Sequence, residues 1–128
     1  MKYYIEKMTN YTFEVAVERV TEELKKEGFG VLTEIDLQAT LKKKLDVDFK
    51  RYRILGACNP PNAYKALQVE NKIGTMLPCN VIIQEYGPNQ VEIAAVNPMA
   101  SMMAVENSAL GVVASEITQR LEKVIINV

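Results

Sequence analysis

Two similar short motifs contain the residues of this sequence that are best suited to chemistry. Each places a cysteine directly before an asparagine, as Cys58-Asn59 and as Cys79-Asn80, with a proline on one side. The first motif closes one predicted strand and the second opens the next. If those strands are antiparallel neighbours, both cysteines and both asparagines lie at one rim of the sheet. Proline removes backbone donors from such a rim and asparagine offers amide groups, which together suit the mouth of a pocket.

Four interpretations of this rim remain open. A binding pocket for a small organic molecule would use the asparagine amides for orientation and apolar walls for affinity. A thiol-redox pair would need Cys58 and Cys79 within disulfide reach, with one thiolate acidified by a helix amino terminus. A metal site is poorly supported because the chain has no histidine, so two thiolates lack obvious further ligands. The structural alternative is that the cysteines are small buried hydrophobes and that Asn-Pro merely ends a strand.

Small-molecule binding at Cys58, Asn59, Cys79 and Asn80 is our leading functional hypothesis. The alternative is a thiol-dependent redox or sulfur-handling enzyme that uses the two cysteines. No residue is predicted to be catalytic, and no cofactor or metal is predicted.

A methionine-rich segment supports a third hypothesis, an oligomeric interaction protein. Met99, Met102 and Met103 lie in an uncharged connection after Pro98 and are candidates for a subunit interface or an apolar groove. The alternative is that they fill the space between the last strand and the final helix. Residues 73–128 carry only two basic residues against five glutamates, so this half forms most of the core or lies against another subunit.

The remaining polar residues favour structural roles. The run of three lysines at 42–44 is interpreted as the solvated face of a short helix, and Asp36 as the cap of that helix. The six tyrosines are spread among several predicted elements and form no stacking platform recognisable from the sequence, so we interpret them as packing residues.

Length and composition indicate one domain over residues 1–128, 48% hydrophobic and 24% charged. A chain of this size folds without disulfides or metal. With 15 basic against 16 acidic groups there is no basic excess, which argues against nucleic-acid binding. The lack of histidine excludes Ser-His-Asp and Cys-His mechanisms.

The sequence also suggests a compartment. The first residues show no apolar segment typical of a secretory signal, and no apolar run approaches the ~20 residues of a membrane span. Two cysteines in a domain with its own core are typical of free thiols in a reducing cytoplasm. We therefore expect a soluble cytoplasmic protein.

Hydrophobic periodicity predicts the elements that position these residues. Strands are expected at 2–8, 30–35, 52–59, 77–84 and 91–97. Helices are expected at 12–27, from Asp36, from Pro61 to about residue 71, and at about 107–126. Gly28 should stop the first long helix in a Schellman ending that folds Phe29 back. The order predicts an α+β fold, an antiparallel sheet with two long helices on one face.

Three segments resemble one protein family. Residues 26–36, 52–60 and 77–81 are similar to the signature of the uncharacterised DUF302 family, in the same order along nearly the whole chain. The resemblance implies a bacterial or archaeal α+β domain with a TATA-binding-protein-like β-α-β4-α topology, and a homodimer. It implies no activity, and the fold name does not imply DNA binding.

Overall fold

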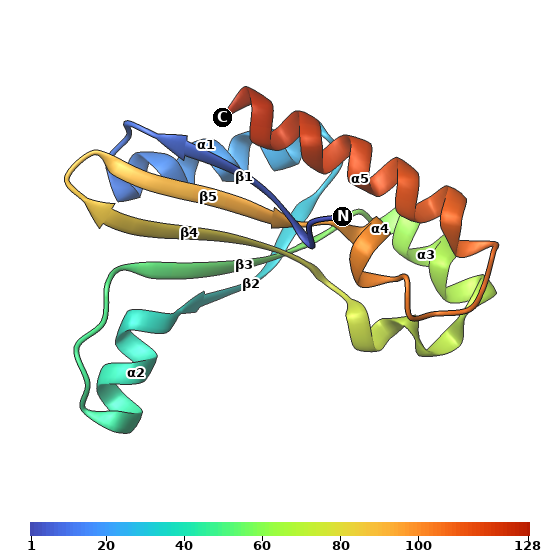
Figure 1. The fold of residues 1–128 in the computed structure, drawn as a ribbon, viewed down its shortest axis with the longest axis horizontal. Helices are drawn as coiled ribbons and strands as arrows, with labels where there is room; N and C mark the ends of the chain where they lie inside the picture. Colours follow the sequence, from blue (N-terminus) through green and yellow to red (C-terminus); the bar gives the residue numbers. More distant parts are fainter.

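The computed structural model describes residues 1–128 as an antiparallel sheet of five strands flanked by helices (Figure 1). The strands are β1 (Tyr4–Thr9), β2 (Gly30–Asp36), β3 (Tyr52–Cys58), β4 (Cys79–Gly87) and β5 (Gln90–Val96). The α-helices are α1 (Phe13–Lys26), α2 (Leu37–Leu45), α3 (Pro60–Val69), α4 (Pro98–Ser101) and α5 (Leu110–Asn127), and a 3₁₀ helix, η1, spans Asn71–Met76. This arrangement confirms the predicted α+β fold.

The strand order β1-β5-β4-β3-β2 brings the first and last strands together and leaves β1 and β2 as the two edges. The long helices α1 and α5 lie side by side over one face of this sheet (Figure 1). Alternate residues of β4 and β5, including Val81, Ile83 and Ile93, are fully buried against them. The opposite face of the sheet has no such cover.

Helix α1 begins and ends where local signals predict. The Thr12 side chain accepts a hydrogen bond from the Val15 amide at 3.3 Å. At the other end the Phe29 amide donates to the Leu24 carbonyl at 2.9 Å, and Gly28 has a φ of 85°. This is the predicted Schellman ending, in which glycine adopts the left-handed conformation without a Cβ clash.

Helix α5 supplies one side of the core through an apolar stripe. Its carboxyl end is held by the Lys7 ammonium, which donates to the carbonyls of Ile126 at 2.9 Å and Val128 at 2.6 Å. A cation at this position satisfies carbonyls that lack a partner within the helix and lies favourably at the negative end of the helix dipole.

None of the helices combines the length and the apolar character that a membrane span requires.

Several predicted boundaries were wrong by one to three residues; the strands expected at 2–8 and 77–84, for example, are β1 and β4 as given above, and three helix ends have identifiable reasons. Helix α3 begins at Pro60 rather than Pro61, because the Asn59 side chain is its cap. It ends at Val69, and η1 continues toward β4. Helix α5 starts later than expected because Asn107 fastens the preceding turn, donating to the Val69 carbonyl at 2.7 Å.

Candidate functional site

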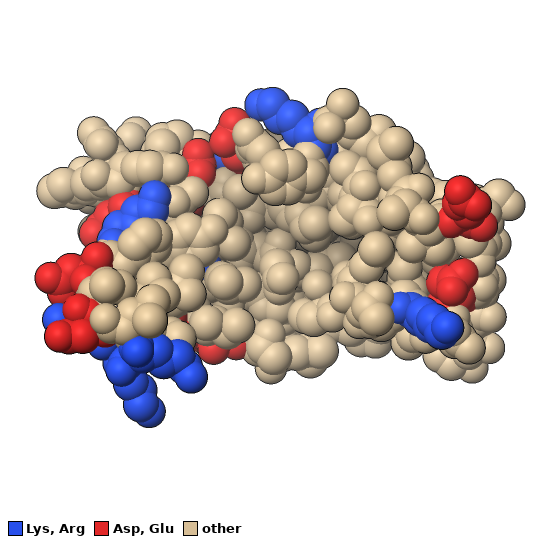
Figure 2. All heavy atoms as spheres, turned by 60° about the horizontal axis from the view of Figure 1, so that its bottom comes forward, with Lys and Arg blue, Asp and Glu red and all other residues tan.

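A groove of about 490 Å³ lies on the open face of the sheet, across β1, β5, β4 and β3. Figure 2 turns this side of the molecule forward and shows a hollow whose charged side chains gather at the margins. The floor is apolar and is formed by Ile82, Ala94 and Val96; Ala95 also borders the groove, although it belongs to the hydrophobic core. A ligand in this groove would therefore contact the middle of the sheet directly.

Strand register brings the groove residues together. Tyr52 of β3 pairs with Gln84 of β4, which in turn pairs with Glu92 of β5. In the neighbouring row Ala94 of β5 pairs with both Ile82 of β4 and Glu6 of β1. Paired residues in adjacent strands share a face, so these side chains all stand on the uncovered side.

Four tyrosines form the walls of the groove, and they come from three strands and the amino terminus. They are Tyr3, Tyr4, Tyr52 and Tyr86. The rings of Tyr3 and Tyr4 pack edge to face, with centroids 4.8 Å apart. Burial raises the pKa of the Tyr52 phenol, and the nearby Tyr86, Tyr3 and Glu92 raise it further. The phenol of Tyr52 is therefore neutral at physiological pH.

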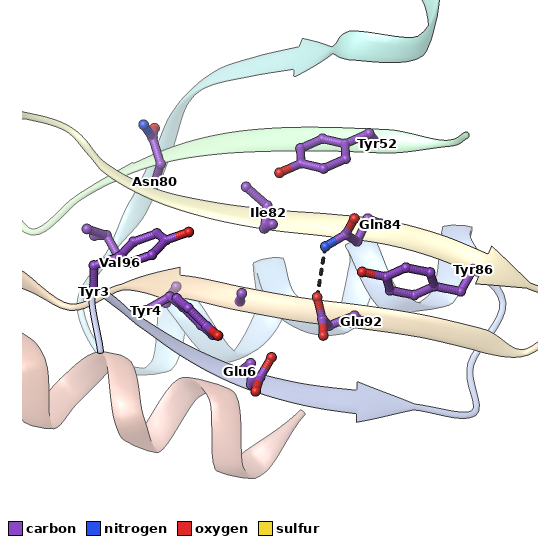
Figure 3. Close-up of a pocket in the computed structure, with 12 residues that line it drawn as sticks. Tyr3, Tyr4, Glu6, Tyr52, Asn80, Ile82, Gln84, Tyr86, Glu92 and Val96 are labelled. Atoms are coloured by element: carbon purple, nitrogen blue, oxygen red, sulfur yellow. Dashed lines mark hydrogen bonds between the residues drawn. The ribbon is translucent and has the colours of Figure 1, made fainter. Parts of the chain in front are cut away.

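Two carboxylates and two amides make part of the lining polar, and one of the amides donates a hydrogen bond to one of the carboxylates. The Gln84 amide donates from Nε2 to Oε1 of Glu92 at 2.8 Å (Figure 3). Half-buried Glu92 has no ion-pair partner. The other carboxylate, on exposed Glu6, lies 3.6 Å from the Lys2 ammonium. Asn80 completes the polar lining.

Two lysine ammonium groups already contact tyrosine rings at opposite ends of the groove. Lys2 Nζ lies 5.5 Å from the centroid of the Tyr4 ring. Lys50 Nζ lies 4.3 Å from the centroid of the Tyr86 ring. Both distances fall within the range in which a cation is attracted to an aromatic face.

The structure keeps Cys58, Asn59 and Cys79 beside one small cavity and places only Asn80 on the open face of the sheet. Cys79 pairs with Ala57 and points to the helix-covered face, where it is 5% exposed. Burial raises the pKa of the Cys79 thiol to about 11, and the neighbouring Cys58 contributes. Cys58 is half-buried at the end of β3. Both thiols are free.

Asn59 is engaged in structural hydrogen bonds. Its side-chain oxygen accepts from the Asn62 amide at 3.3 Å, and its amide donates to the Glu27 carbonyl at 3.3 Å. It thereby caps α3 and joins that helix to the end of α1. Asn80, by contrast, is exposed and lines the groove.

The cavity next to Cys58, Asn59 and Cys79 measures about 10 Å³, room for about one water molecule. The binding site predicted at this rim stays a prediction, because only Asn80 among its four residues reaches a space large enough for an organic molecule.

The methionines are also divided. Met102 is 6% exposed and belongs to the hydrophobic core. Met99 and Met103 are 37% and 69% exposed. The segment therefore fills the space before α5 with one side chain and leaves the other two accessible.

Sequence reasoning missed the tyrosine groove. Its walls come from strands far apart in the chain, and only the pairing order places them together. One local signal was present, since Gln84 and Tyr86 alternate outward along β4 as Tyr4 and Glu6 do along β1.

No group of three or more histidine, cysteine, aspartate or glutamate residues is arranged to hold a metal ion.

Comparison with known proteins gives a family and a fold. The family model described as "Domain of unknown function DUF302" matches residues 5–128. The crystal structure of an uncharacterized conserved DUF302 protein from Bacillus stearothermophilus is similar, with 26% sequence identity and a TM-score of 0.92. The match covers 99% of this chain and 98% of that one. No curated protein matches the sequence.

Proposed function

The chain belongs to the DUF302 family, whose function is unknown, and we propose from its geometry that it is a small-molecule-binding domain. The ligand lies in the tyrosine-lined groove on the open face of the sheet. The proposed function is the one expected from the sequence, but the proposed site is the groove and not the Cys-Asn rim. Asn80 is the one residue that belongs to both sites.

The observation that carries the proposal is the groove itself. Its volume of about 490 Å³ is in the range of small-molecule sites, which run from about 300 to 1,000 Å³. An apolar floor, aromatic walls and a few polar groups are the usual composition of such sites. The cavity at the Cys-Asn rim, about 10 Å³, offers no comparable room.

The test is a titration of isotope-labelled protein with small aromatic probes of different charge, followed by backbone amide shifts. We expect saturable shifts concentrated in β4 and β5. The substitution Ala94→Phe, which fills the groove floor, should abolish them. Val112→Phe, at a 77% exposed position on α5, is the matched control and should leave them unchanged. If no probe moves the groove amides, the proposal is wrong.

We also propose that the chain forms a homodimer through α2 and the strand before it. Helix α2 projects from the end of the sheet (Figure 1) and has no buried residue in its own chain. Large apolar side chains are exposed there, among them Leu32 at 68% and Leu45 at 66%. Exposed large apolar side chains favour an interface on this part of the surface. Light scattering should give a dimer for the natural protein and a monomer for Leu45→Asp; a natural monomer would contradict the proposal.

The remaining expectations are proposals of the same kind. The two free thiols support the expectation that the protein is located in a reducing cytoplasm. The element order, with α1 after the first strand and α5 after the last, supports the TATA-binding-protein-like topology that the family resemblance implies.

A further inference from the structure

We propose that the ligand of this groove is an organic cation, an amine or quaternary ammonium compound with an apolar portion. The cationic group lies against Glu92 and the ring faces of the tyrosines, and the apolar portion lies on the floor. This inference rests on the proposed function, since it specifies the chemical class that the groove takes.

The charge of the lining is the first argument. Glu6 and Glu92 are the only acidic residues in the lining, and no basic residue lines the groove. Glu92 is half-buried, and its side-chain partner is the neutral amide of Gln84. A carboxylate that is partly removed from water favours a cationic partner. An anionic ligand would instead meet two carboxylates of like charge.

The tyrosine rings are the second argument. The face of an aromatic ring is electron-rich and attracts ammonium groups, and cages of such rings are a common device for binding alkylammonium ligands. In the close-up, Tyr52 lies above Gln84 and Tyr86 lies to the right of the Gln84–Glu92 pair (Figure 3). A cation that reaches Glu92 therefore lies in the groove that the rings of Tyr52 and Tyr86 also line.

The lysines of the chain provide the third argument. Lys2 contacts Tyr4 and Glu6 at once, through a cation–ring distance of 5.5 Å and an ion pair of 3.6 Å. This is the same combination of ring and carboxylate that we propose for the ligand. Lys50 stacks on Tyr86 at the other end, and neither lysine forms an ion pair with Glu92. The Glu92 carboxylate is left for a ligand from solution.

The experiment compares 2-phenylethylammonium with 2-phenylethanol, which has the same ring and chain without the charge. We expect the ammonium probe to bind the groove at least about tenfold more tightly than the alcohol, as shown by the shifts of β4 and β5 amides. High salt should reduce this preference.

The variant Glu92→Gln should lower the preference for the ammonium probe to about threefold or less, with the alcohol affinity unchanged. Glu122→Gln, an exposed position on α5, is the matched control and should keep the full preference. Glu6→Gln, on an edge strand and exposed, is a second variant should Glu92→Gln alter the fold; it should reduce the preference in part.

The outcomes separate the two proposals. Equal groove affinities for the two probes would overturn the cation inference and leave small-molecule binding standing. Absence of groove shifts with either probe would overturn both. A dimer whose second copy covers the open face, released by Ala94→Arg, would also overturn both.

Discussion

The amide of Gln84 donates to the carboxylate of Glu92 across the β4–β5 pair, with Nε2 and Oε1 2.8 Å apart. The two residues are register partners, so the bond lies on the uncovered face, within the groove. The bond engages one carboxylate oxygen, and the second oxygen points away from Gln84 (Figure 3). A carboxylate is thus held among the apolar and aromatic side chains of the groove.

Lys2 should compete with a cationic ligand. Because its ammonium occupies Tyr4 and Glu6, the substitution Lys2→Ala should strengthen binding of 2-phenylethylammonium by about two- to fivefold, the scale of an exposed ion pair. The measurement is the probe affinity from amide shifts. Lys123→Ala, an exposed lysine on α5, should have no effect. Weaker binding in the Lys2 variant would contradict the account.

Asn59 should matter for stability and not for the groove. Asn59→Ala removes the cap of α3 and the bond to the Glu27 carbonyl, so chemical denaturation should show a loss of about 1–2 kcal/mol. Asn59→Ser retains a capping oxygen and should lose less. The matched control is Asn80→Ala, exposed on the open face, which should change the free energy of unfolding by less than about 0.5 kcal/mol. Equal losses at both asparagines would show that the motifs play equivalent structural roles.

The two cysteines should differ in reactivity. With a pKa of about 11, roughly one Cys79 thiol in a thousand is ionised near pH 8, and its 5% exposure limits access further. Alkylation of the folded protein should therefore modify Cys58 before Cys79. Denatured protein should react at both positions. If Cys79 were alkylated faster than Cys58 in the folded protein, this prediction would be wrong and the hypothesis of thiol chemistry would gain support.

The raised pKa of Cys79 also predicts how stability depends on pH. The folded state favours the neutral thiol, so this contribution is complete below the unfolded pKa near 9 and is lost as pH rises toward about 11. The difference in unfolding free energy between the natural protein and Cys79→Ala should shrink over that interval. A difference that stays constant between these pH values would show that the buried thiol does not titrate as the structure implies.

Local signals were sufficient for the ends of α1. Thr12 supplies a capping oxygen and Gly28 a left-handed residue, and both act within one helical turn. The start of α5 could not be predicted from local signals, because Asn107 before it is held by a hydrogen bond to the distant carbonyl of Val69. Such a contact leaves no trace in hydrophobic periodicity.

The Cys-Asn motifs show what periodicity leaves undetermined. Their similarity suggested one shared rim, yet the pairing of Ala57 with Cys79 places that cysteine on the covered face and its neighbour Asn80 on the open face. Asn59 lies beyond the end of its strand and turns to cap α3. A one-residue difference in register decides which face a side chain takes, and the sequence alone does not determine it.

The tyrosines show the same limit for the groove. Tyr4, Tyr52 and Tyr86 are separated by long stretches of chain and are joined only by the order β1-β5-β4-β3. Each one, considered alone, is an ordinary amphipathic strand residue. The candidate site could be recognised only once all four strands were assembled.

A crystal structure of the protein grown with 2-phenylethylammonium tests the central claim most directly. We expect the probe on the open face of the sheet, with its ring over Ile82 and Ala94 and its ammonium within hydrogen-bonding distance of the Glu92 carboxylate. A probe bound elsewhere, or an open face filled by a second copy of the chain, would contradict the claim that this surface is a ligand site.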